Sequence, residues 1–296
     1  MHRRGPESPC VFGRIDVGGT NAHRRVSTRM AQSIARSMQP APDLSRSAVL
    51  VLSLAQVAAA AMQVVGLGTP IGEQSDAVRT LTTPAGWAFS IWGALYTGAF
   101  VFAIYQALPS QRDNAYVRGL RWPAALAFLG NALWALYVQL VDLGAISVAI
   151  IFLSLGALLV ALKHMTSWTR PLSAGDRWCV RLPLSALAAW LTAATIVNIA
   201  ASLRFHGIEA DASAAPLIAA GVLALGGAIA GTALARSWGN LPFALVFLWA
   251  LAAIYAAGGQ LFSWVAYATI FAALETLVGT VIGQRLERTR RARDSN

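Results

Sequence analysis

The stretch AGWAFSIWGALYTGAFVFAIYQAL, residues 85–108, contains seven aromatic side chains and no charged one. A membrane-spanning helix needs about 20 consecutive, mostly apolar residues, because the hydrocarbon holds no water to bind unpaired backbone amides. Residues 85–108 meet this requirement. The chain as a whole is 56% hydrophobic and 12% charged, whereas a soluble domain carries roughly 25% charged residues. The sequence therefore indicates a polytopic membrane protein and excludes an ordinary soluble enzyme.

Charged residues separate the other apolar tracts in the same way. Five tracts lie between charges, at 46–73, 121–142, 142–163, 181–204 and 211–236. The neutral stretch 237–274 is too long for one span, and Gly258 and Gly259 divide it into helices near 241–257 and 262–283. Together with residues 85–108 these tracts predict an all-α, polytopic membrane helix bundle of about eight transmembrane helices.

The basic residues predict the orientation of the bundle. Of the 23 Lys and Arg, all except Arg79 and Arg204 fall in the N-terminal segment, in alternate loops or after the last span. Cytoplasmic segments carry the excess of Lys and Arg, so we expect a multi-pass protein of the cell membrane with both termini cytoplasmic. This placement also explains the net charge of +10. Since little folded polar surface is left to carry these charges, the lipid bilayer is the expected partner and nucleic acid is not.

The chain divides into four predicted segments. Residues 1–46 are rich in Arg, Ser, Pro and Gly and are expected to form a disordered cytoplasmic tail. An alternative is that translation starts at Met30 or Met38. A five-helix core at 47–204 and a three-helix extension at 205–284 follow, and residues 285–296 form a second basic tail.

Aromatic side chains form a stripe on the helix predicted at 85–108. At 100° per residue, four of them fall within a face of about 80°: Phe89, Trp92, Tyr96 and Phe100. Trp and Tyr at membrane depth bring a polar N–H or O–H that needs a partner, which favours the wall of a pocket. At the two ends of the helix, Trp87 and Tyr105 fit interfacial anchors better.

Two later spans add amides and further aromatic rings. The third span carries Asn131, Trp134 and Tyr137, and the fifth carries Trp190 and Asn198. An Asn in hydrocarbon must form a hydrogen bond inside the bundle or line a cavity, so each Asn is either a link between helices or a ligand contact. Flat aromatic surface with a few amides suits a planar, largely apolar molecule.

These motifs resemble a known family. The segments TPAGWAFSIWGALY (83–96), NALW (131–134) and WLTAATIVN (190–198) are similar to those of the TspO/MBR family, the tryptophan-rich sensory proteins related to the mitochondrial translocator protein. The resemblance covers residues 47–204. The single Pro84, a Phe89-to-Trp92 spacing one residue shorter than usual and three further spans mark a longer, divergent branch.

The resemblance implies a function and a set of site residues. It implies a sensory or regulatory protein, not an enzyme, that binds a porphyrin or a sterol-like molecule, with no required cofactor and a tetrapyrrole as the candidate ligand. The expected ligand-binding residues are those of the matched motifs, together with Tyr137 from the same span as Trp134: Trp87, Phe89, Trp92, Tyr96, Asn131, Trp134, Tyr137, Trp190 and Asn198. Catalytic and metal sites are not expected, because no cluster of His, Asp, Glu or Cys lies at membrane depth and no nucleophile lies near a base.

Two features of the last spans leave alternatives open. Glu275 is the single acidic residue within a predicted span, and an intramembrane carboxylate indicates function by default. It therefore supports a proton-coupled secondary transporter of a small hydrophobic molecule, or else a structural hydrogen bond. Gly227 and Gly231 form a small-xxx-small pair, which predicts close helix packing either within the chain or between two copies in a homodimer.

Overall fold

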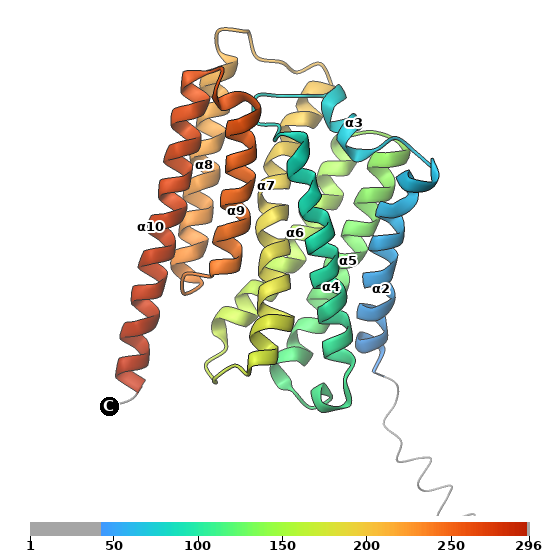
Figure 1. Ribbon diagram of the computed structural model, residues 1–296, viewed down its shortest axis with the longest axis vertical. Coiled ribbons are helices and arrows are strands. Elements are labelled where there is room, and N and C mark those ends of the chain that lie inside the picture. Colours follow the sequence, from blue (N-terminus) through green and yellow to red (C-terminus); the bar gives the residue numbers. More distant parts are fainter. Residues whose placement is uncertain (1–42, 295–296) are drawn as a thin grey trace, which may run out of the picture. The chain divides into compact units, whose positions relative to one another are not determined.

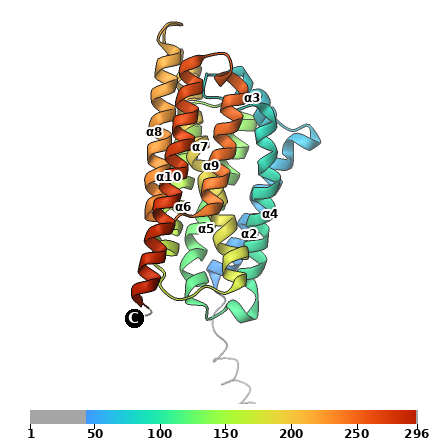
Figure 2. The same cartoon turned by 60° about the vertical axis from the view of Figure 1, so that its left-hand side comes forward.

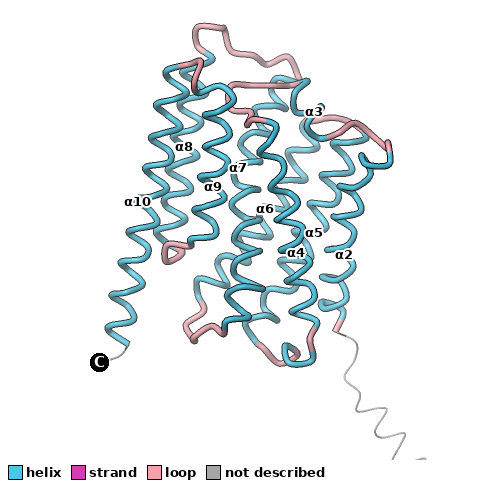
Figure 3. Tube along the Cα trace, in the orientation of Figure 1, coloured by secondary structure: helices cyan, strands magenta, loops and turns pink. Residues whose placement is uncertain are grey.

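The computed structural model describes residues 43–294, which form an antiparallel bundle of helices with no strand in that range (Figures 1 and 3). Eight helical segments there are long and apolar enough to cross a membrane, so the predicted all-α bundle of eight spans is confirmed. The long helices are α2 (Leu44–Ala61), α4 (Ile91–Ala107), α5 (Ala115–Leu140), α6 (Ala145–Ser167), α7 (Leu182–Phe205), α8 (Ala215–Arg236), α9 (Leu241–Ile254) and α10 (Ser263–Asp294).

The helices alternate in direction, and the basic residues collect at one end. The loops after α4, α6 and α8 lie at the same end as the start of α2 and the end of α10, at the bottom of Figure 1. We call this the basic end, because it carries Arg112, Arg170, Arg236 and the arginines of the last turns of α10. Both ends of the described chain therefore lie on one side of the bundle. That this side is cytoplasmic stays a prediction.

The expected tail at residues 1–46 lies mostly outside the described residues, and α2 already begins at Leu44. At the other end of the chain, α10 continues through the arginine-rich segment to Asp294 (Figure 2). Arginine is a good helix former, and Arg291 pairs with Glu287 one turn earlier at 2.5 Å. The basic residues from 285 onward thus extend the last helix.

Short elements fill the connections. The turn η1 (Met62–Val65), the helix α3 (Ile71–Ala77) and the 3₁₀ turn η2 (Gly86–Ser90) lie between α2 and α4, and η3 (Pro109–Gln111) follows α4. Two π-helical turns adjoin longer helices: η4 (Asp176–Arg181) leads into α7, and η5 (Tyr255–Gly259) ends α9. π-Helical turns are rare in proteins, and those that occur are often found at functional sites.

Helices α8 and α10 lie side by side in Figures 1 and 2, with their backbones in contact through glycines. A Cβ added at Gly227 would lie 2.5 Å from the Cα of Ala272, and one added at Gly231 would lie 2.6 Å from the carbonyl oxygen of Glu275. Small residues allow this approach in a membrane. The Gly227 and Gly231 pair therefore packs within the chain. A homodimer stays a prediction, and its contact would not be formed by this glycine pair.

Candidate functional site

The candidate site is a small cavity of ≈ 50 Å³ in the half of the bundle away from the basic end. Helices α3, α4, α5, α7 and α9 all contribute to its wall, with η2 between α3 and α4. Its aromatic lining consists of Phe89, Trp92, Trp134 and Trp190. The motifs on three separate spans thus meet around one space. That these residues bind a ligand stays a prediction.

Trp92 is the centre of the aromatic cluster. Its ring stacks on Trp134 with centroids 6.1 Å apart and meets Trp190 edge to face at 6.0 Å. Phe89 in turn meets Trp190 edge to face at 6.3 Å. Offset and edge-to-face pairs at these distances are the favoured arrangements of aromatic rings, so the cluster holds flat surfaces in fixed orientations.

The expected aromatic stripe on α4 is shorter than its sequence period indicates. Tyr96 stacks on the outer side of Trp92 at 5.2 Å and is not part of the cavity lining. Phe100 is 41% exposed, whereas Phe102 is fully buried against Phe128. The stripe therefore ends at Tyr96, because Phe100 is exposed and Phe102 packs against Phe128 of α5 instead.

The polar groups of the cavity divide into bonded and unbonded donors. Trp134 Nε1 donates to Asn198 Oδ1 at 2.9 Å, and Asn198 Nδ2 donates to Ser147 Oγ at 2.7 Å. This chain connects α5, α7 and α6. In contrast, the Nε1 atoms of Trp92 and Trp190 are buried and have no hydrogen-bond partner within residues 43–294. A buried N–H without a partner costs about 1–3 kcal/mol, so these two donors require an explanation.

Three other predicted site residues lie outside the cavity lining. Asn131 donates to Gln56 Oε1 on α2 at 3.1 Å, which makes it a link between helices. Tyr137 donates to Asp142 in the α5–α6 loop at 3.4 Å. Trp87 is 49% exposed and meets Trp249 edge to face at 4.8 Å. Because Trp87 and Phe89 are two residues apart in the 3₁₀ turn η2, their side chains point in different directions.

Sequence reasoning missed the contribution of α9. Ala250 and Ile254 line the cavity, although α9 lies in the predicted extension. The backbone N–H of Ala85 donates to Ala253 O at 3.0 Å, and Trp249 Nε1 donates to Ala88 O at 3.3 Å. Helix α9 is thus bonded to the segment that carries the aromatic motif. The sequence signal for this contact was weak, because alanine and isoleucine occur in any membrane span and do not indicate a binding site.

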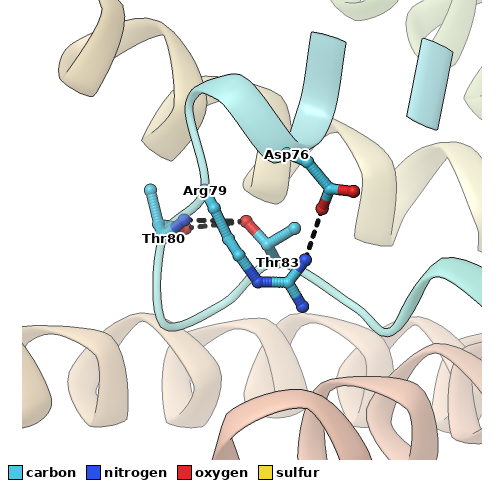
Figure 4. A network of polar contacts seen from close by, with 4 residues as sticks. All are labelled: Asp76, Arg79, Thr80 and Thr83. Carbon is cyan, nitrogen blue, oxygen red and sulfur yellow. Dashed lines mark hydrogen bonds and ion pairs between the residues drawn. The ribbon is translucent and has the colours of Figure 1, made fainter. Parts of the chain in front are cut away.

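A short polar segment lies next to the cavity at the end opposite the basic end. Ile71 and Ser75 of α3 and Pro84 lie in the lining. Between them, Arg79 pairs with Asp76 at 2.5 Å, and the backbone N–H of Thr80 donates to Thr83 Oγ1 at 2.9 Å (Figure 4). The segment from Asp76 to Thr83 is therefore a turn closed by its own side chains, at the outer side of the aromatic cluster.

A larger hollow of ≈ 920 Å³ adjoins this segment, lined by residues 79–83 and by the facing ends of α7 and α8. A narrow space of ≈ 20 Å³ lies between the hollow and the cavity. It shares Thr82 and Val222 with the hollow, and Val197 and Ile254 with the cavity. The three spaces thus form a series from the outer end of the bundle to Trp92 and Trp190.

Glu275 lies in a different part of the bundle. Its Oε2 atom is buried without a hydrogen-bond partner within residues 43–294, and it lies beside Gly227 of α8. Helix α10 contributes nothing to the lining of the aromatic cavity. Glu275 is therefore not among the residues that surround the aromatic cavity.

Comparison with protein-family models gave a match to the model described as TSPO-like protein, over residues 46–282. The matched range covers most of the chain and runs through all eight long helices. Comparisons with curated proteins and with solved structures gave no significant match.

Proposed function

The chain belongs to the TSPO-like protein family, and on this premise we propose that it is a membrane receptor for a planar, largely apolar molecule. The family match and the bundle of eight spans support a multi-pass membrane protein of this kind. The proposed ligand is a tetrapyrrole or a sterol-like molecule held among the aromatic rings, and its role is sensory or regulatory rather than catalytic.

The observation that carries the proposal is the pair of unbonded indole donors in an aromatic wall. Trp92 Nε1 and Trp190 Nε1 are buried without a partner in the described part of the chain, and both residues line the cavity. A ligand with acceptor atoms at its edge and an apolar face satisfies both requirements at once. The bonded pair of Trp134 and Asn198 would fix the wall against which the ligand packs.

The size of the cavity adds a condition. Pockets for drug-sized ligands measure roughly 300–1,000 Å³, whereas this cavity measures ≈ 50 Å³. The cavity in this structure is too small for a tetrapyrrole, so binding requires it to widen. The series of spaces past Thr82 and Ile254 to the ≈ 920 Å³ hollow supplies the direction. We propose that the segment from Asp76 to Thr83 moves to admit the ligand.

The direct test is a titration of the purified protein with protoporphyrin IX, followed by quenching of tryptophan fluorescence. We expect saturable quenching, and an affinity about tenfold lower in Trp92→Phe and Trp190→Phe, because each loses one hydrogen bond of about 1 kcal/mol and part of the ring surface. The matched control is Trp122→Phe, since Trp122 is 54% exposed on α5 and lines neither the cavity nor the hollow that adjoins it. Saturable binding with equal affinity in all three variants would reject the cavity as the site.

A second candidate function is proton-coupled transport through Glu275. The buried oxygen of Glu275 without a partner in the described part of the chain supports it, since carboxylates within spans frequently belong to proton pathways. Uptake of the ligand into proteoliposomes should respond to a proton gradient and be lost in Glu275→Gln, while Asp113→Asn, at an exposed position in the α4–α5 loop that lines neither the cavity nor the hollow, should retain it. Uptake by Glu275→Gln at the parental rate would reject this candidate.

A further inference from the structure

A groove at the basic end carries chemistry that the proposed receptor function does not use. A hollow of ≈ 940 Å³ lies between α4, α7, α9 and α10, and a second of ≈ 320 Å³ lies between the α6–α7 loop and α10. The two share Arg177, Arg181, Trp238, Glu287 and Arg291 in their linings. They therefore form one continuous groove, which we call the basic groove.

The lining of the basic groove is strongly positive at one end. Among the described residues that line it there is one carboxylate, Glu287, and it pairs with Arg291. The arginines of the lining are Arg170, Arg177, Arg181, Arg288, Arg290 and Arg291. They come from the α6–α7 loop, from η4 and from the last turns of α10. Two regions distant in sequence, the segment 170–181 and the end of α10, thus bring like charges together, which is unfavourable unless an anion lies among them.

Away from the arginines, the larger hollow is lined mainly by apolar side chains. On one side α4 contributes Ile91, Ala94 and Leu95, and on the other α9 contributes Leu245 and Val246. Leu245 is 67% exposed in the bundle. The charged end and the apolar walls belong to the same hollow, so a single molecule that fills it must have an anionic end and a hydrocarbon part.

The turn between α8 and α9 holds the charged end in place. Trp238 adopts φ of 60°, a left-handed conformation that costs a residue with a side chain about 1–2 kcal/mol. Its Nε1 donates to Thr166 O at 3.1 Å, and Arg290 lies 5.1 Å above its ring. The next residue, Gly239, also has a positive φ, and a Cβ there would overlap the carbonyl oxygen of Thr280. The indole thereby connects α6, the α8–α9 turn and α10.

We infer that the basic groove binds one anionic phospholipid, with its phosphate among Arg177, Arg181, Arg288 and Arg291 and an acyl chain between α4 and α9. Arginine forms paired hydrogen bonds to phosphate oxygens, and basic pockets between spans hold anionic headgroups. Trp178, at the mouth of the groove, is placed like the aromatic residues that mark the membrane interface.

The charge of the groove selects among membrane lipids. The headgroup of phosphatidylcholine carries a quaternary ammonium beside its phosphate, and this cation would lie against the arginines. The headgroup of phosphatidylglycerol has no cation. We therefore expect the groove to prefer phosphatidylglycerol to phosphatidylcholine, although both lipids offer the same acyl chains to α4 and α9.

Native mass spectrometry of the delipidated full-length protein tests this site. Phosphatidylglycerol and phosphatidylcholine with identical chains are added in turn, and the bound fraction is measured for the parent and for Arg177→Gln/Arg181→Gln. A basic residue near an anionic headgroup contributes about 1 kcal/mol, or about fivefold in affinity. We expect the double variant to bind phosphatidylglycerol about 25-fold more weakly, with phosphatidylcholine unchanged. The matched control is Arg112→Gln/Arg118→Gln, which removes two exposed arginines at the same end that do not line the groove.

Two further arms separate the groove from a general attraction to charge. Ala94→Trp fills the apolar part and leaves every arginine in place, so it should weaken phosphatidylglycerol binding at least fivefold. Water-soluble glycerol phosphate should compete poorly, because it lacks the acyl chain. Equal binding of the two lipids by the parent, equal losses in the two double variants, or full competition by glycerol phosphate would each overturn the assignment. Thermal unfolding monitored by circular dichroism identifies any variant that fails to fold, and the lipid comparison in the parent does not depend on such variants.

Discussion

The aromatic cavity and the α8–α10 interface solve the problem of packing in a membrane in opposite ways. Around Trp92, large flat side chains keep the helices apart and leave a space of ≈ 50 Å³. Between α8 and α10, glycines bring backbones into contact and leave no room for a methyl group. Large rigid side chains hold a cavity open in the first region, whereas small residues allow close contact between two helices in the second. Each region also buries polar atoms without partners in the described part of the chain, on Trp92 and Trp190 in the first and on Glu275 in the second.

The largest expected effect on stability comes from adding one methyl group to the α8–α10 interface. A Cβ at Gly227 would lie 2.5 Å from the Cα of Ala272, whereas a Cβ at Gly221 on the same helix meets nothing within 4 Å. We expect Gly227→Ala to destabilise the bundle by about 1–3 kcal/mol, and Gly221→Ala to leave it unchanged or slightly more stable. Thermal unfolding in detergent, monitored by circular dichroism, measures both. Similar unfolding temperatures for the two variants would contradict the backbone contact.

The opposite result is expected when a side chain is enlarged in the cavity. Ala193 lines both the cavity and the narrow space beside it. Ala193→Leu should change the free energy of unfolding by less than about 1 kcal/mol, because it occupies empty space, and should lower protoporphyrin affinity at least tenfold. Ala149→Leu, on an exposed face of α6, serves as the control. A large loss of stability in Ala193→Leu would show that the space is not available to a side chain.

Asn131 and Asn198 differ in what their hydrogen bonds hold in place. Asn131 bonds to Gln56 away from the cavity, whereas Asn198 fixes the indole of Trp134 in its wall. We expect Asn131→Leu and Asn198→Leu each to lower stability by about 1 kcal/mol. Fluorescence titration should show weaker ligand binding in Asn198→Leu and parental affinity in Asn131→Leu. The reverse pattern would move the site toward α2.

The smallest effect is expected at the segment from Asp76 to Thr83. The Asp76 and Arg79 side chains are 63% and 42% exposed, and such surface pairs contribute about 0–1 kcal/mol. Asp76→Asn should therefore leave the unfolding temperature almost unchanged, while stopped-flow fluorescence should show faster ligand association. Glu287→Gln removes an ion pair at the other end and should leave the association rate as it was. Unchanged rates in both variants would argue against entry past this segment.

Much of the fold was predictable from the placement of charge. Gaps between charged residues gave the positions of the spans, because a charge at the centre of a bilayer is expensive and a loop carries it freely. This reasoning gave inexact bounds for a span where an arginine lies within the helix. Arg121 is fully buried in α5, where its guanidinium donates to Gln111 O at 3.0 Å. Hydrogen bonds to backbone carbonyls near the helix end offset the cost of burying this guanidinium. A hydropathy value for the segment does not include this effect.

The candidate site was predictable only in part. Trp92, Trp134, Trp190 and Asn198 come together as expected, because each lies on the inner side of its own helix. Asn131 and Tyr137 lie on the same helix as Trp134 but point to other neighbours, and a sequence motif does not state which neighbour a face meets. The contribution of α9 was not foreseen, since Ala250 and Ile254 are ordinary residues for any span.

The two hydrogen bonds from the aromatic segment to α9 also bear on the order of events during synthesis. Ala85 and Ala88 are translated long before Ala253 and Trp249, to which they are bonded. When the first five spans have entered the bilayer, one side of the aromatic cluster is still without its wall. The cavity is completed only when the seventh span arrives, so a chain that ends after α7 would leave the side of the cavity that Ala250 and Ile254 line open.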